Sequence, residues 1–155
     1  MTVNVRRIVT GHDKNGKAVV TIDDMSPNIA KRAPKISSTL VWMDDEFPYK
    51  VFGDEDMGAR NIPRPPPPNG VIFRVVEFEP HAPGDRHVTQ TIDFAVIMSG
   101  KIDMELDDGV KVTMKAGDTL VQRATVHNWL NVYDEPCVVA FVLIDVAQGK
   151  ERPAK

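Results

Sequence analysis

Cysteine is almost missing from this sequence of 155 residues: Cys137 stands alone, so no disulfide can form within the chain. Chains without disulfides suit a reducing compartment, and we expect a cytoplasmic protein. Aromatic residues are also scarce, at 6%, and the net charge is only −3. Because no stripe of lysine and arginine is interleaved with aromatic residues, the composition argues against a nucleic-acid partner.

Long hydrophobic runs are absent as well. The longest apolar stretch, residues 138–144, has the length of a buried strand, whereas a membrane-spanning helix needs roughly 18–20 apolar residues. Residues 1–7 contain no apolar core of the kind found in secretory signals. The sequence therefore predicts no membrane partner, and its length fits one domain.

Short strand-like segments recur about every 8–12 residues with turn residues between them, which predicts an all-β sandwich or barrel. Residues 3–9 and 17–22 flank Asn15-Gly16, a strong hairpin signal. Helical periodicity is poor, although residues 26–33 could form one short helical turn. Further strands are expected at 39–43, 71–78, 92–98, 102–106, 110–114, 119–122, 127–132 and 138–146.

Two of these strands, 92–98 and 102–106, surround Ser99-Gly100, and we expect them to form a hairpin. Both faces of 92–98 are apolar, which indicates a strand buried on both sides.

Residues 44–68 interrupt the strand pattern with acidic residues, glycines and the run Pro65–Pro68. Polyproline is stiff, extended and without backbone donors. We expect this arm to cross the surface, pack on a partner subunit, or cover the mouth of a pocket. The expected organisation is a single domain: N-terminal strands and arm (1–68) packed on a barrel (69–147), followed by a frayed tail (148–155).

Two polar blocks carry the candidate chemistry, residues 84–93 and 117–127. On one continuous strand, His87, Thr89 and Asp93 would point to the same face because they share parity. The second block supplies His127. Two imidazoles and one carboxylate that converge inside a barrel can hold a divalent metal and leave positions open for substrate.

The spacing of these blocks resembles the two motifs of the cupin superfamily. In the first motif, His87 stands at the first histidine, Thr89 at the second histidine and Asp93 at the glutamate, with Gly100 as the closing glycine. The second motif is matched by Gly117-Asp118, His127 and Asn131. The resemblance implies a double-stranded β-helix, or jelly-roll, barrel that carries an N-terminal hairpin extension and a Pro-rich loop. It also implies a homodimer.

Two departures from this pattern concern the metal. Thr89 cannot replace an imidazole as a strong ligand, and Asp93 is one methylene shorter than glutamate. The resemblance therefore leaves two alternatives. His87, Asp93 and His127 hold Fe, Mn, Ni or Zn, or no metal binds and the same residues act by acid–base catalysis.

Other residues near the two blocks are candidates for contact with a small organic substrate. Arg123 could grip a carboxylate or enolate oxygen, because a guanidinium matches such groups, and we count it with the catalytic residues. The expected pocket residues are Thr89, Thr91, Gln122 and Trp129.

Three functions stay open at this point. The first is an enzyme of metal-assisted carbonyl or enolate chemistry, of the decarboxylase, dehydratase or isomerase type. The second is a ligand-binding barrel without turnover, and the third is a structural dimeric module with an unused pocket. A non-haem iron dioxygenase stays open as the alternative enzyme. Fold alone does not decide among them.

Overall fold

A computed structural model describes residues 3–61 and 65–146. In this part of the chain nearly all regular structure is β-strand, and two single turns of 3-10 helix, η1 (Met57–Ala59) and η2 (Asp107–Gly109), lie in loops. The strands are β1 (Arg6–His12), β2 (Ala18–Met25), β3 (Ile29–Ala33), β4 (Ile36–Asp44), β5 (Val71–Phe78), β6 (Thr91–Ser99), β7 (Lys101–Glu105), β8 (Lys111–Lys115), β9 (Thr119–Arg123), β10 (Asn128–Leu130) and β11 (Cys137–Asp145).

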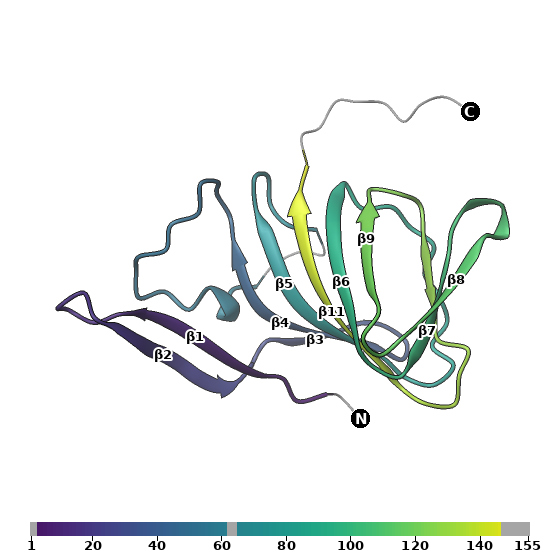
Figure 1. Cartoon of the computed structure of the whole chain (residues 1–155), viewed down its shortest axis with the longest axis horizontal. Coiled ribbons are helices and arrows are strands. Elements are labelled where there is room, and N and C mark those ends of the chain that lie inside the picture. The colour runs from purple at the N-terminus through teal and green to yellow at the C-terminus, as the bar shows by residue number, and fades with distance from the viewer. Residues whose placement is uncertain (1–2, 62–64, 147–155) are drawn as a thin grey trace.

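The strands form two sheets that face each other and a separate hairpin. One sheet has six strands in the order β3-β4-β5-β11-β6-β9, and the other has three in the order β10-β7-β8. Every neighbouring pair is antiparallel. The two sheets curve around a common interior, while the β1–β2 hairpin projects away from them as an arm (Figure 1).

The hydrophobic core joins the two sheets. Ile72 and Ile97 of the six-stranded sheet and Ile102 of the three-stranded sheet are fully buried in it. Trp129 of β10 belongs to the same cluster. Because the inward faces of strands alternate with outward faces, this core also fixes which side chains reach the interior.

Most of the predicted strands are confirmed. The hairpin around Asn15-Gly16 forms between β1 and β2, and Gly16 adopts a positive φ of 76° in its turn, a conformation that suits glycine. The predicted strand at 71–78 coincides with β5, and those at 39–43, 110–114, 119–122, 127–132 and 138–146 overlap β4, β8, β9, β10 and β11.

The predicted pairing of 92–98 with 102–106 is wrong. β6 pairs with β11 and β9 in one sheet, whereas β7 pairs with β10 and β8 in the other. The chain passes between the sheets at Gly100, which has a φ of 74° and lies so close to the carbonyl of Pro136 that a Cβ would collide with it. The expectation that β6 is buried on both sides is also wrong, since Phe94, Val96 and Met98 are exposed on the outer face.

The six-stranded sheet begins earlier in the chain than predicted. Residues 29–33 form β3 rather than a helical turn, and β4 pairs with β5 along its length. The expected division at residues 68 and 69 therefore falls between two neighbouring strands of one sheet. The predicted tail at 148–155 lies outside the described residues, and no helix in the described part is both long and apolar enough to cross a membrane.

Candidate functional site

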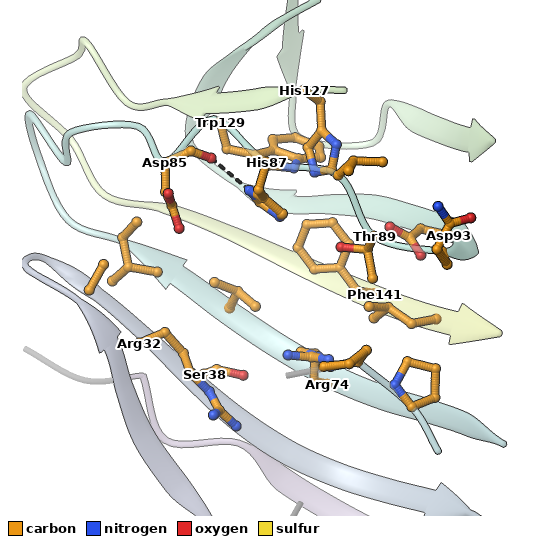
Figure 2. Close-up of a pocket in the computed structure, with 18 of the residues that line it drawn as sticks. Arg32, Ser38, Arg74, Asp85, His87, Thr89, Asp93, His127, Trp129 and Phe141 are labelled. Atoms are coloured by element: carbon orange, nitrogen blue, oxygen red, sulfur yellow. Dashed lines mark hydrogen bonds between the residues drawn. The ribbon is translucent and has the colours of Figure 1, made fainter. Parts of the chain in front are cut away.

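A pocket of about 550 Å³ opens between the sheets, a size typical of sites for small molecules. Its walls come from β3, β4, β5, β6, β10 and β11 and from the segment before β6 (Figure 2). Pro65, Pro66 and Pro68 also line it, so the proline arm contributes to the pocket, one of the three positions considered for it. The lining side chains that bear on function are Arg32, Ser38, Arg74, Asp85, His87, Thr89, Gln90, Asp93, His127, Trp129 and Phe141.

One wall carries the two motif histidines side by side. His87 and His127 form an isolated antiparallel bridge, in which each backbone N–H donates to the carbonyl of the other at 3.0 and 2.9 Å. Their ring centroids lie 4.4 Å apart. The backbone pairing of two distant segments thus brings the two imidazoles together (Figure 2).

The tautomer of His87 is set by its backbone partner. Its Nδ1 lies 2.6 Å from the carbonyl oxygen of Asp85 (Figure 2). A carbonyl oxygen only accepts hydrogen bonds, so Nδ1 carries the proton and donates it. The Nε2 of neutral His87 therefore keeps its lone pair, as a proton acceptor needs.

His127 has two different partners at Nδ1. The carbonyl oxygen of Thr125 lies 3.0 Å away and accepts from Nδ1–H, and the side-chain amide of Gln122 lies 2.8 Å away and can donate to a bare Nδ1. Both neutral tautomers of His127 are thereby supported. Burial lowers the pKa of this imidazole; the hydrogen bond to Thr125 opposes the shift, and the nearby charge of His87 adds to it. The net lowering favours a neutral His127 ring at neutral pH.

Trp129 lies next to the histidines on the apolar floor of the pocket. Its ring meets that of Phe141 edge-on at 5.3 Å and that of His127 edge-on at 6.4 Å. The prediction that Trp129 contributes to the pocket agrees with its place in the lining.

Asp93 enters the pocket from β6, next to Thr89 (Figure 2). Its Oδ1 accepts a hydrogen bond of 2.6 Å from the Thr91 hydroxyl. Burial raises the pKa of this carboxyl, although the Thr91 hydrogen bond and the positive charges of Arg74 and His87 act in the opposite direction. The pKa of Asp93 therefore lies above its ordinary value, because desolvation outweighs the effect of its neighbours.

The three proposed metal ligands share the pocket without forming a ligand group. In the stretches that the structure describes, no set of three or more His, Cys, Asp or Glu side chains is arranged to hold a metal ion. The histidines converge, but Asp93 lies beside Thr89 and is engaged by Thr91 (Figure 2). Strand parity did not extend through the first block, because β6 begins only at Thr91. The residues present thus do not fit a three-ligand metal centre.

The same break in the strand corrects other predictions for the site. Gln90, which was not among the predicted pocket residues, lines the pocket. Thr91 is fully buried and supports Asp93 rather than contacting the pocket, and Gln122 supports His127 in the same way. Arg123 does not take the catalytic position proposed for it: it follows the inward Gln122 on β9, so alternation turns it outward, where it is exposed.

Asn131, the asparagine of the second motif, is structural. It is buried, its amide donates to the carbonyls of Phe78, Glu79 and Glu135, and its oxygen accepts from the backbone N–H of Tyr133. These bonds fix the turn that follows β10.

Sequence reasoning missed the opposite wall of the pocket. Arg32, Ser38 and Arg74 lie there, on β3, β4 and β5 (Figure 2). A signal for Arg74 was present, because it shares parity with Ile72, which is fully buried in β5. A charged residue on the inward face of an apolar strand is a candidate for function.

The sequence of this chain is similar to sequences of known proteins. A cupin-domain family profile matches residues 74–145. The chain is 32% identical over 147 residues to the cupin-domain-containing oxidoreductase fogC of Aspergillus ruber, which covers 91% of this chain and 72% of the relative. It is 30% identical over 137 residues to the phomopsin biosynthesis cluster protein C′ of Diaporthe leptostromiformis, which covers 81% and 69%.

Solved structures agree on the fold. An RmlC-like cupin from Shewanella frigidimarina matches with a TM-score of 0.54 at 12% identity, over 78% of this chain and 86% of that one. The two sheets and their enclosed pocket thus define a jelly-roll β-barrel. The chain belongs to the cupin superfamily, and its relatives include proteins named as oxidoreductases and as members of biosynthesis clusters.

Proposed function

We propose that this cupin is an enzyme that moves a proton on a small carbonyl compound, in a dehydration or an isomerisation. The observation that carries the proposal is the histidine pair, in which the Asp85 carbonyl fixes the His87 tautomer and leaves Nε2 as a proton acceptor. The relatives named for biosynthesis clusters favour a biosynthetic intermediate as the substrate.

The proposed first step is removal of a proton next to the substrate carbonyl. The Nε2 of His87 accepts the proton, and the electrons of the broken C–H bond move into the carbonyl to give an enolate. His127 lies beside His87 and has support for both of its tautomers, so it can donate an Nε2–H to the enolate oxygen or relay the proton. A positioned acid or base of this kind contributes roughly 10²- to 10⁴-fold in rate.

The second step distinguishes the two reactions. In a dehydration, the enolate electrons return and expel the β-hydroxyl group, which leaves as water with a proton from Asp93. In an isomerisation, the substrate carries a β,γ double bond conjugated with the enolate, and the proton returns to the γ-carbon, which leaves an α,β double bond. Burial raises the pKa of Asp93 and so favours the protonated carboxyl that the dehydration needs.

Oxidation or reduction of a small molecule is the second candidate function, favoured by the similarity to the cupin-domain-containing oxidoreductase of Aspergillus ruber. In the described part of the pocket, the two imidazole rings of His87 and His127 are the candidate metal ligands that lie close together. We derive no metal-dependent step, because the side chains do not supply the third ligand of a typical site.

Deuterium exchange tests the proposal without knowledge of the natural substrate. The protein is incubated in D₂O with a panel of aryl and alkyl ketones, with and without a carboxyl group, and proton NMR follows loss of the α-hydrogen signal. We expect catalysed exchange with wild-type protein, before and after treatment with a chelator, and none with the His87→Gln variant.

Two results would contradict the proposal. The first is exchange that is equally fast with wild type and with the His87→Gln variant. The second is exchange that stops on chelation and returns with a stoichiometric metal, which would favour the metal-dependent alternatives.

A further inference from the structure

Three polar side chains form a cluster on the pocket wall that faces the histidines. Arg32, Ser38 and Arg74 come from the neighbouring strands β3, β4 and β5. In Figure 2 they lie on one side of the cavity, and His87 and His127 lie on the other. We call these three residues the arginine cluster.

The arginine cluster places positive charge on one wall of the pocket. Arg74 is buried and Arg32 is half-buried, and a guanidinium stays charged at any ordinary pH. The positive charge of Arg74 also acts on Asp93, where it partly offsets the rise in pKa that burial causes.

Three carboxylates also line the pocket. Asp85 lies next to His87, and Asp93 lies next to Thr89 (Figure 2). Asp145 accepts a hydrogen bond from the backbone N–H of Asn69. These carboxylates stand on β6, on β11 and in the segment before β6, whereas the arginine cluster stands on β3, β4 and β5.

Between the arginine cluster and the histidines the wall is apolar. Phe141 lies there (Figure 2) and is the cross-strand neighbour of Arg74; Val76 and Leu143 add further apolar lining to the pocket. A ligand that spans the pocket meets a cationic end, an apolar body and an imidazole end, in that order.

We propose that the pocket selects molecules with a carboxylate at one end of an apolar body, and that Arg32, Ser38 and Arg74 bind this carboxylate. Guanidinium groups present donors in a planar fork that matches carboxylate oxygens, and the Ser38 hydroxyl adds a further donor. The choice of which end reacts rests on the proposed function, whereas the binding of the carboxylate does not.

A matched pair of probes tests the binding in wild-type protein. Isothermal titration calorimetry compares 3-phenylpropanoate with 3-phenylpropanamide, which have the same apolar body and differ in charge. We expect the carboxylate to bind about 10- to 100-fold more tightly, as hydrogen bonds to a charged group would give. Equal affinity for the two probes, or tighter binding of the amide, would overturn the inference.

Variants locate the carboxylate site. Arg74→Met and Arg32→Met remove one guanidinium each and keep an unbranched side chain, and each should reduce the preference for the carboxylate by about tenfold. Arg123→Met is the matched control, because Arg123 is exposed and outside the pocket lining, and it should keep the wild-type preference. A preference that survives both pocket substitutions would place the carboxylate elsewhere and overturn the inference.

Two further comparisons keep the test decisive. If Arg74→Met does not fold, the Arg32→Met variant and the comparison of the two probes in wild-type protein still test whether the pocket binds the carboxylate. His87→Gln should abolish exchange yet keep the preference for the carboxylate. Loss of that preference in His87→Gln would contradict the separation of the two ends, whereas absence of exchange in wild type with an intact preference would contradict only the proposed function.

Discussion

The pocket wall that carries His87 and His127, called the histidine wall, and the arginine cluster occupy opposite sides of one pocket, but they are built differently. His87 and His127 come from segments outside long strands, and backbone pairing and carbonyl contacts hold their rings in place. Arg32, Ser38 and Arg74 stand on three neighbouring strands of the large sheet. The first wall offers groups that exchange protons, and the second offers charges that do not titrate. Reaction and recognition should therefore be separable by mutation.

The largest expected effect comes from the histidines. Replacing His87 or His127 with Gln removes a proton carrier, and we expect the exchange rate to fall roughly 10²- to 10⁴-fold. The affinity for 3-phenylpropanoate should change little, because the carboxylate is held at the other wall. Rate and affinity measurements on the same preparations make the comparison, and an equal loss of both would show that the two walls act as one unit.

Gln122 tests whether the histidine wall depends on its support. Its amide lies 2.8 Å from Nδ1 of His127, and Gln122→Leu keeps a similar volume without hydrogen bonds. We expect the exchange rate to fall about 10- to 100-fold, because the ring loses its fixed orientation, while KM stays near the wild-type value. A rise in KM with an unchanged kcat would instead assign Gln122 a binding role.

The pH dependence should follow the histidine wall. Burial holds the pKa of His127 below its ordinary value of 6.5. A relay through His127 needs this ring to be neutral, so that it can take the proton from His87. The exchange rate should therefore stay high from neutral pH down to the lowered pKa of His127 and fall below it. An acidic limb that lies above pH 6.5 would contradict this assignment.

The lowered pKa of His127 also predicts how the stability of the protein depends on pH. The unfolded chain takes up a proton near pH 6.5, whereas folded His127 resists protonation, so the free energy of unfolding should decrease as the pH falls below that value. Chemical denaturation as a function of pH measures it, and His127→Gln should flatten the decrease. The Asp93 carboxyl has a raised pKa in the folded protein, so its effect on stability has the opposite sign. Its contribution to the free energy of unfolding decreases as the pH rises through the pKa of folded Asp93.

Thr91 provides a smaller test on the side of the pocket between the two walls. Thr91→Val removes the hydroxyl that donates to Asp93 Oδ1 at nearly constant shape. We expect the free energy of unfolding to fall by about 1–3 kcal/mol at neutral pH, because the buried carboxyl loses a hydrogen-bond donor. The pKa of Asp93, followed by carboxyl carbon NMR, should rise further. A pKa that falls would contradict the role given to Thr91.

Sequence reasoning reached the fold and half of the site. Strand alternation and turn residues predicted most strands, and motif spacing predicted that His87 and His127 meet. The sequence-based predictions were wrong, or missing, where the position of a side chain depends on how distant strands pair. The end of pairing before Thr91 turned Gln90 inward and separated Asp93 from the histidines. The arginine cluster belongs to no motif, since β3, β4 and β5 become neighbours only in the folded sheet.

The protonation of His87 tests the central claim most directly. A long-range proton–nitrogen NMR correlation spectrum of the chelator-treated protein near neutral pH distinguishes the imidazole tautomers. The structure predicts that the neutral His87 ring carries its proton on Nδ1, donated to the Asp85 carbonyl, and has a bare Nε2. A neutral His87 ring that carries its proton on Nε2 would contradict it and leave the pocket without the base that the proposed reaction requires.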